Sequence, residues 1–232
     1  MIAIPSHIVL LILFTIFWVF LYARSRSTRR EMLIIGLLGF ILTPVIYFLN
    51  AQTLGFDDLT IDLSHFLFSF LFAGVASVIF HELFGRKYRR RKELFFKRHL
   101  QDAHWLLHLF ILVGGWAWGG VLFVFLLQTS AFQGLIVSAL LVGMIVIATR
   151  HDLVWDALWS GLLMMVVFLL LYEIAFFKRG PVVSSEWWGM TNLQERFISS
   201  VPLEAIIWAA VTGFVLGPLY EYARGLKLGT GK

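Results

Sequence analysis

The sequence predicts an all-α fold, a polytopic membrane bundle of about seven transmembrane helices. Apolar residues make up 59% of the 232 residues, against roughly 45–50% in a typical soluble domain. Charged residues make up only 14%, and the mean hydropathy is +0.84. Apolar runs of about 20 residues, the length that crosses a bilayer core, recur along the whole chain. This composition excludes a soluble enzyme and a disordered chain.

Seven apolar runs long enough to span a membrane follow one another. They cover about 7–23, 32–50, 63–84, 104–127, 131–149, 153–177 and 200–223. The first run has the place of a signal peptide. No basic residue precedes it, however, and no small-residue cleavage site follows it, so we expect a retained span.

The basic residues predict how the spans are oriented. All but three of the 19 Lys and Arg residues fall on one side of the membrane when seven spans alternate. Because basic loops remain in the cytoplasm, we expect the N-terminus outside and the C-terminus inside the cell membrane. The most basic segment, 86–98, is expected to contact anionic lipid rather than nucleic acid.

An internal repeat relates spans 1–3 to spans 5–7. The aligned pairs, most of them 139 residues apart, are Gly74 and Gly213, His65 and Glu204, His81 and Tyr220, Glu82 and Glu221 and, more weakly, Glu31 and Asp152. The fourth span restores the chain direction, so the repeats are predicted to be parallel, with a site at their interface. The predicted units are the first repeat (1–85), a loop with a linker span (86–130) and the second repeat (131–232). We expect the aligned glycine helices to pack centrally, His65 to approach Glu204, and Glu82 to approach Glu221.

Ionisable residues inside the spans are functional hypotheses, because each costs about 2.5–3.5 kcal/mol at a helix centre. Those expected near the inner ends form a secondary polar cluster: His81, Glu82, His104, His108, Asp152, Asp156, Tyr220 and Glu221. Two of them, Glu82 and Glu221, lie one helical turn before a following arginine. This spacing favours interfacial ion pairs with Arg86 and Arg224 over a catalytic role.

Two polar pairs have the i, i+4 spacing that shares one helix face. His104 and His108 lack the glutamate of the zinc-protease motif, which favours packing or hydrogen bonding inside the bundle. Asp152 and Asp156 match the magnesium-binding DxxxD of membrane prenyltransferases, but the second acidic pair, at 57–58, is expected on the opposite side. Neither pair therefore predicts a metal site.

Tryptophans within the spans suggest either interfacial belts or an aromatic pocket for a cation. Trp155 and Trp159 share a helix face next to the aspartate pair, and Trp208 lies in the last span. Glu204 begins that span after two serines and Pro202, which predicts a hydroxyl cap and a proline in the first turn. Glu204 is then either a first-turn carboxylate favoured by the helix dipole or a partly buried acid.

Several segments resemble the integral-membrane lycopene cyclases. VPLEAIIWAAVTGFVLGPLYEYARG (201–225) is similar to their last span, and REMLIIGLLGF (30–40) and WWGMTNL (187–193) resemble bacterial members. Their short motif is a proline, any residue and two acids. Here Ala205 replaces the second acid, and His65 stands where the first half of the family has an acid.

The resemblance implies a redox-neutral cyclisation of an isoprenoid polyene, started by proton transfer from Glu204 with His65 as its partner. It places Pro202, Trp208, Trp155 and Trp159 around the substrate and requires neither cofactor nor metal. The partners are then membrane lipid and a carotenoid-like substrate, with homo- or hetero-oligomers possible. Two alternatives stay open: a non-catalytic isoprenoid- or lipid-binding protein, and a small transporter.

Overall fold

The computed structural model describes residues 6–24, 26–54, 62–85, 87–90, 98–176, 197–198 and 201–229. The helices are α1 (Ser6–Arg24), α2 (Arg29–Leu54), α3 (Leu63–Phe84), α4 (Arg98–Leu127), α5 (Ala131–Thr149), α6 (Val154–Phe176), α8 (Leu203–Leu216) and α9 (Leu219–Arg224), with a 3-10 turn at His151–Leu153. The strands are β1 (Lys87–Arg90), β2 (Phe197–Ile198), β3 (Val201–Pro202) and β4 (Leu226–Gly229).

Seven helical segments of the described chain are long and apolar enough to cross a membrane, which confirms the predicted all-α bundle. They are His7–Arg24, Arg29–Leu49, Leu63–Phe84, Trp105–Leu127, Ala131–Thr149, His151–Phe176 and Leu203–Arg224. Their ends lie within a few residues of the predicted runs. The seventh segment consists of two helices, because α8 ends at Leu216 and α9 starts only at Leu219.

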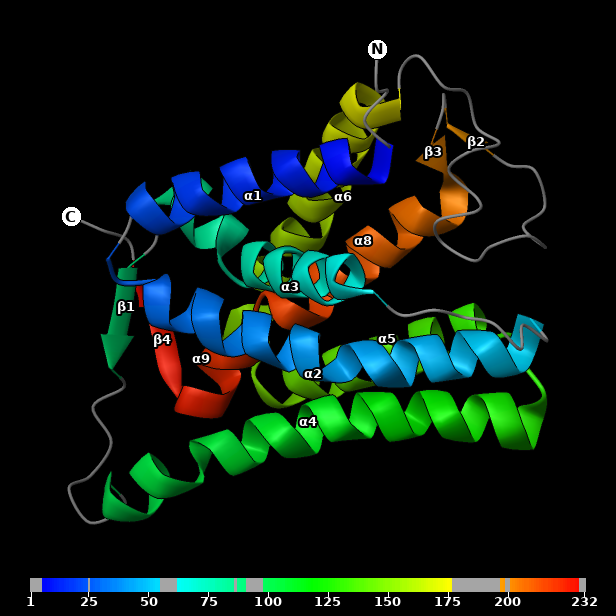
Figure 1. The fold of residues 1–232 in the computed structure, drawn as a ribbon. Coiled ribbons are helices and arrows are strands. Elements are labelled where there is room, and N and C mark those ends of the chain that lie inside the picture. The colour runs from blue at the N-terminus through cyan, green and yellow to red at the C-terminus, as the bar shows by residue number, and fades with distance from the viewer. Residues whose placement is uncertain are drawn as a thin grey trace.

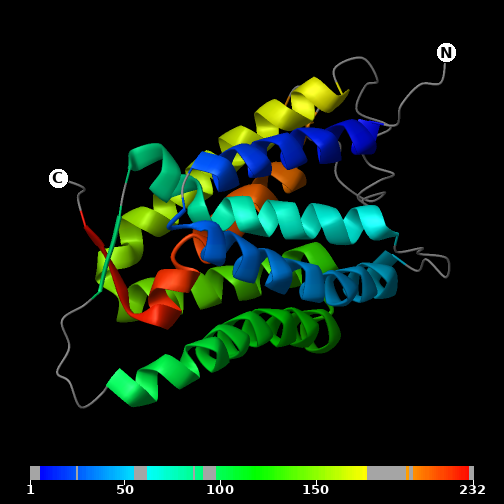
Figure 2. The ribbon, with the colours of Figure 1, turned by 60° about the vertical axis from the view of Figure 1, so that its left-hand side comes forward.

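The two repeats are parallel, as the sequence predicts. Helices α3 and α8 run in the same direction, from right to left in Figure 1, and Figure 2 shows the same relation from another side. Corresponding helices also pack alike. The most extensive contacts of the first repeat join α2 to α3 and those of the second join α6 to α8, while α1 packs on α3 as α5 packs on α8.

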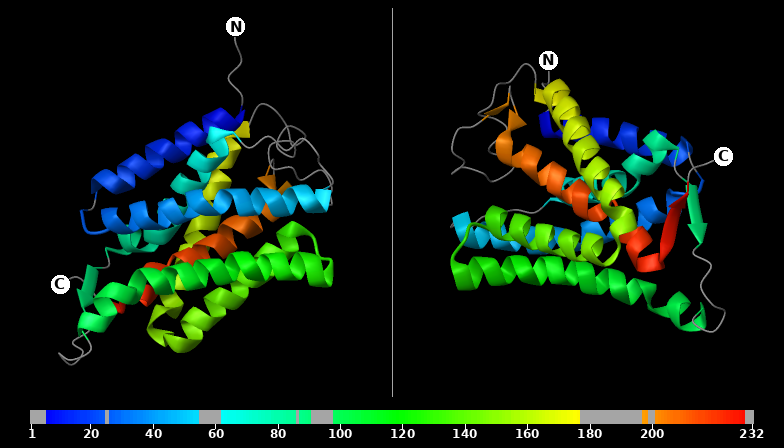
Figure 3. Two further views of the ribbon diagram at one scale, coloured as in Figure 1. Left: turned by 60° about the horizontal axis from the view of Figure 1, so that its bottom comes forward. Right: turned by 180° about the vertical axis from the view of Figure 1, so that it is seen from behind.

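Helix α4 is the linker span between the repeats. It lies beside α5 along one side of the bundle (Figure 3). Gly119 and Gly120 bring the two helices close, because a Cβ on either would lie 2.7–2.8 Å from a side chain of α5. At Gly114 and Gly115 no atom lies within 4 Å of such a Cβ, so these two glycines face open space.

Both repeats end in the same backbone motif. Gly85 and Gly225 adopt the left-handed conformation, with φ of 61° in each, and each amide donates to the carbonyl four residues before it, His81 or Glu221. The strands that follow, β1 and β4, pair antiparallel. A left-handed glycine is a common way to end a helix, and here it turns both chain segments into one small sheet.

The predicted central packing of Gly74 and Gly213 is confirmed. A Cβ on Gly74 would lie 3.0 Å from the Met32 carbonyl of α2, and one on Gly213 would lie 2.5 Å from the Ser160 carbonyl of α6. Neither glycine therefore faces lipid. Small residues of this kind let membrane helices approach closely.

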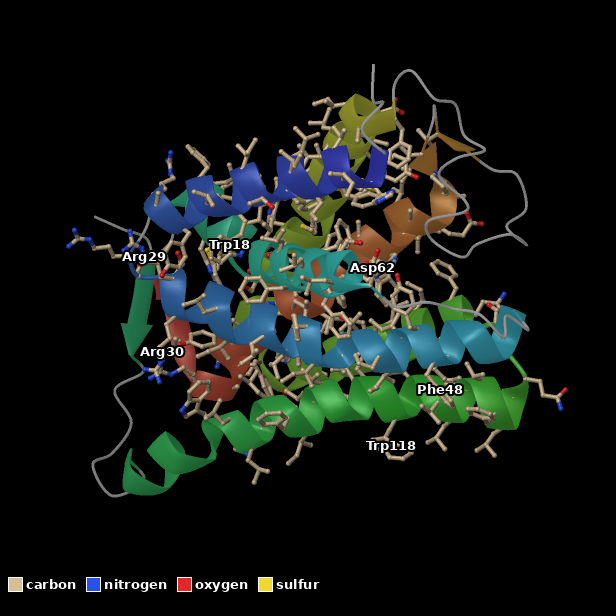
Figure 4. All side chains as sticks on the ribbon, in the orientation of Figure 1. Trp18, Arg29, Arg30, Phe48, Asp62 and Trp118 are labelled. Atoms are coloured by element: carbon tan, nitrogen blue, oxygen red, sulfur yellow. The ribbon has the colours of Figure 1, made fainter. Side chains whose placement is uncertain are left out.

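The two ends of the bundle differ in charge, whereas its outer surface is apolar. Figure 4 shows Arg29 and Arg30 at the end that carries β1, and Asp62 at the other end of α3. Trp118 points outward from α4, and 68% of its surface is exposed. An outward apolar face and buried polar groups are what a helical bundle in lipid requires.

Candidate functional site

Glu204 lies in the first turn of α8, at the bundle end opposite β1. The predicted hydroxyl cap is wrong: the helix begins after Pro202, and no side chain caps it by a hydrogen bond. Pro202 instead occupies the cap position and pairs with Phe197 in the short β2–β3 ladder. The two serines before it lie outside the described residues.

The Glu204 carboxyl group is partly enclosed. Its Oε2 atom is buried and has no hydrogen-bond partner. Within the described ranges, Glu204 takes part in no ion pair. Ala205, which replaces the second acid of the motif, is fully buried.

A pair of indole rings includes Trp208, which lies one helical turn after Glu204 in α8. Trp208, four residues further along α8, packs against Trp116 of α4 with ring centroids 5.9 Å apart. The Trp116 Nε1 atom donates to the Leu135 carbonyl at 3.0 Å, which fixes its ring plane. Paired indole faces of this kind are suited to stabilising a cation.

His65 lies in the first turn of α3, at the same end as Glu204. Its Nδ1 atom is 2.8 Å from the Asp62 carboxylate, and its ring meets Tyr47 edge-on at 4.6 Å. Helices α3 and α8 contact each other. The groups that orient the imidazole are thus Asp62 and Tyr47, and its cooperation with Glu204 stays a prediction.

The other two predicted substrate tryptophans lie elsewhere. Trp155 is 68% exposed and Trp159 is 37% exposed, and Trp159 packs on Phe84. The buried face of α6 starts instead with Asp156 and Ser160, the residues that directly follow Trp155 and Trp159. One residue turns a helix by about 100°. Both indole rings therefore point away from the buried face that carries Asp156.

The most buried polar cluster of the described chain lies at the bundle end that carries β1, the end predicted to be the inner one, and is assembled from four helices. Glu31 of α2, His81 of α3, Asp156 of α6 and Glu221 of α9 are each at most 2% exposed. The His81 Nε2 atom lies 3.5 Å from Asp156 Oδ2, and its Nδ1 atom lies 3.5 Å from Glu221 Oε1. Both repeats therefore contribute groups to one centre, which we call the inner cluster.

Ser160 of the second repeat makes two contacts beside the inner cluster. The Ser160 hydroxyl donates to Asp156 Oδ1 at 3.1 Å. Ser160 also packs against Gly217, where a Cβ would lie 2.4 Å from its hydroxyl oxygen. Because Gly217 and Pro218 separate α8 from α9, the helix break lies beside the cluster.

The structure corrects the predicted pairing of Glu82 with Glu221. Glu82 accepts a hydrogen bond from Thr28 at 2.8 Å and lies 3.9 Å from Arg24, whereas His81 faces Glu221. The helix break adds one residue to the second repeat. Counted back from the glycine caps, the offset is therefore 140 residues, and His81 rather than Glu82 is equivalent to Glu221.

The predicted interfacial ion pair of Glu221 with Arg224 is also wrong. Glu221 is 0% exposed and faces inward. Arg224 instead donates to the Tyr220 hydroxyl at 2.8 Å and lies 5.1 Å above the ring of Trp105. Tyr220 thus belongs to an aromatic layer on α4 and α9, outside the contacts of the inner cluster.

The two aspartates of the i, i+4 pair do not stay together. Asp152 is exposed and binds Arg150, whereas Asp156 is buried, because a 3-10 turn at His151–Leu153 precedes α6. His108 is exposed rather than packed inside the bundle. The side chain of His104 lies outside the described ones, as do those of the basic segment 86–98.

Sequence reasoning missed the role of Glu31 and the separation of Asp156 from Asp152. The repeat alignment pairs Glu31 with Asp152, but in the structure Glu31 lies in the inner cluster with Asp156. A usable signal was present: Asp156 and Ser160 begin a stripe of small or polar residues along α6 that includes Gly161. Such a stripe marks the face of a membrane helix that contacts another helix.

Arg150, in the loop between α5 and α6, holds the inner end of the second repeat together. It donates to the Leu226 carbonyl at 2.7 Å and to the Glu221 carbonyl at 3.3 Å. A two-atom contact with Asp152, at 2.7 and 2.9 Å, orients the guanidinium. The hydrogen bond to Asp152 raises the pKa of Arg150 further above its ordinary value, so the cation persists at any physiological pH.

Replacing Arg150 with glutamine is expected to lower the free energy of unfolding by about 1–3 kcal/mol, because charge-assisted bonds to two carbonyls are lost. Unfolding in mixed micelles measures the loss. Arg24→Gln is the matched control, since Arg24 is 59% exposed and 3.9 Å from its partner. Exposed pairs contribute at most about 1 kcal/mol, so equal losses in the two variants would contradict the anchoring role.

Comparisons with protein-family models, with curated proteins and with solved structures give no match for this chain.

Proposed function

We propose that this chain is a membrane enzyme of the carotenoid-cyclase type, with Glu204 as its proton donor. The observation that carries the proposal is the enclosed Glu204 carboxyl group, which has a buried Oε2 atom without a hydrogen-bond partner. Trp208, one helical turn further along α8, pairs with Trp116 of α4. Glu204 also occupies the acid position of the cyclase-like motif that begins at Pro202.

The proposed reaction is an isomerisation. The Glu204 proton adds to a terminal double bond of an isoprenoid polyene and leaves a tertiary carbocation. A neighbouring double bond attacks that cation and closes a six-membered ring by a new carbon–carbon bond. Loss of a ring proton then restores a double bond, so atoms and electrons balance without an oxidant or reductant.

His65 is proposed as the group that accepts the ring proton. Its Nδ1 atom lies 2.8 Å from the Asp62 carboxylate, and we assign the proton transfer to Nε2, the other ring nitrogen. The apolar surroundings, including buried Ala205, support the scheme because water would otherwise capture the cation.

The proposal includes an orientation and partners. We infer that the N-terminus lies outside the cell membrane and the C-terminus in the cytoplasm, because the basic loops then face the cytoplasm. The substrate is an isoprenoid or carotenoid that enters from the lipid. A homo- or hetero-oligomer is compatible with the exposed apolar faces.

Replacing Glu204 with glutamine is expected to reduce the cyclised product by about 100-fold or more, the usual contribution of a general acid. Pigment analysis of lycopene-producing cells that express the protein measures this. The control is Glu82→Gln, because Glu82 lies near the opposite end of the bundle. This variant should retain activity. Equal product from wild type and Glu204→Gln would exclude Glu204 as the acid.

The two alternatives predict different results. If folded wild-type protein cyclises no acyclic carotenoid but copurifies with it, the protein is a non-catalytic isoprenoid-binding protein. The break between α8 and α9 beside the inner cluster favours the second alternative, a transporter, because broken helices in such proteins surround ion sites. Cation flux into proteoliposomes containing the purified protein would identify that activity.

A further inference from the structure

We propose that Glu31, His81 and Glu221 bind a divalent transition-metal ion, with zinc as the best-fitting ion. One ligand atom from each residue can be chosen so that all three lie within 4.8 Å of one another. The site goes beyond the proposed cyclisation, because the inner cluster lies 17 residues from Glu204 along the last span, or roughly 25 Å of helix.

The separation of His81 from Glu221 fits a shared ion. Their facing atoms, Nδ1 and Oε1, are 3.5 Å apart, which is longer than a good hydrogen bond. Two ligands at 2.0–2.1 Å from a tetrahedral ion are about 3.3–3.4 Å apart. A nitrogen and oxygen at this distance therefore need little movement to hold one ion between them.

The inner cluster gathers several carboxyl groups away from water. Three carboxyl groups, those of Glu31, Asp156 and Glu221, surround a single imidazole at sites that are at most 1% exposed. Glu221 adds a second observation, since both its carboxylate oxygens are buried without a hydrogen-bond partner. Buried carboxylates are normally paired or bound to a metal, and a divalent ion would give the Glu221 oxygens a positively charged partner.

Asp156 and Ser160 are suited to position the histidine ligand. Asp156 Oδ2 lies 3.5 Å from His81 Nε2, the nitrogen that faces away from Glu221. The Ser160 hydroxyl holds the other Asp156 oxygen at 3.1 Å. Metal-bound histidines usually direct their second nitrogen to a carboxylate that orients the ring, and Asp156 is in that position.

The bound ion would join the two repeats. Glu31 and His81 belong to the first repeat, and Glu221 belongs to α9 of the second. Imidazole with carboxylate oxygens is a donor set that suits zinc and its neighbours better than magnesium or calcium. We therefore expect the ion to stabilise the contact between the repeats at their inner end.

Metal analysis of the full-length protein, purified with a histidine-free tag, tests the proposal. We expect about one zinc or similar ion per chain by mass spectrometry of the metals. After treatment with a chelator, cobalt should restore one ion per chain and give the visible absorption of tetrahedral cobalt. His81→Gln and Glu221→Gln should lose the ion, whereas Glu82→Gln, the neighbour of His81, should keep it.

Asp156→Asn separates positioning from direct binding. It should bind zinc in the same stoichiometry but about 10–100-fold more weakly. If the ligand variants fail to fold, the metal content and the cobalt spectrum of the wild-type protein test the site on their own. No zinc or cobalt bound to folded wild type, or equal binding by Glu221→Gln and wild type, would overturn the site.

The identity of the retained ion also bears on the proposal. Retention of magnesium or calcium only would show that the imidazole is not a ligand, and would overturn the assignment. Because these measurements read metal content and not pigment, a negative result is distinguishable from failure of the proposed cyclase function, which depends on Glu204.

Discussion

We expect the replacement of His81 by leucine to lower the free energy of unfolding by about 3–5 kcal/mol, the usual cost of removing one partner from a buried ionic contact. His81 is 2% exposed and lies 3.5 Å from both Asp156 and Glu221. Without the imidazole, the buried carboxylates face one another and an apolar side chain. Unfolding of the purified protein in mixed micelles measures the change.

A double-mutant cycle distinguishes this effect from the loss of packing alone. Asp156→Leu removes one of the carboxylates that His81 faces, so the pair of substitutions should cost less than the sum of the two single ones. Coupling of about 0.5–3 kcal/mol is typical of residues in one network. Strict additivity would show that the contact between His81 and Asp156 contributes nothing to stability.

The fold was predictable because its determinants are local and periodic. Bilayer thickness sets the length of an apolar run, so the number and ends of the spans follow from hydropathy alone. The parallel repeat was predictable from Gly74 and Gly213, which are fixed by close helix contacts. A contact that tolerates only glycine leaves a trace in a sequence even where the surrounding residues differ.

The inner cluster was only partly predictable, because it depends on single-residue changes in helix phase. The 3-10 turn at His151–Leu153 directs Asp152 outward and leaves Asp156 on the buried face. The break at Gly217–Pro218 shifts the repeat register by one residue, so that His81 rather than Glu82 meets Glu221. A pattern based on a uniform helical period cannot show either shift. For the same reason the sequence could not show that Trp155 is exposed.

The last span is the second place where a large effect is expected. Gly213→Val should lower the free energy of unfolding by about 3 kcal/mol, at the upper end of overpacking effects. A Cβ at this position would lie 2.5 Å from the Ser160 carbonyl oxygen and 2.7 Å from the Met164 Cβ. Backbone atoms cannot rotate away, so α8 must separate from α6, and the inner cluster, which needs Asp156 of α6, should loosen with it.

A graded series of valine substitutions controls for the change in helix propensity. At Gly114 of α4, no atom lies within 4 Å of the position that a Cβ would take, so Gly114→Val should change the free energy of unfolding by less than about 1 kcal/mol, the scale of helix propensity. Gly74→Val should fall between the two, because its closest neighbour, Trp18 Nε1 at 2.6 Å, belongs to a side chain that can move. Equal losses at Gly213 and Gly114 would show that the contact of α8 with α6 is not what holds the second repeat together.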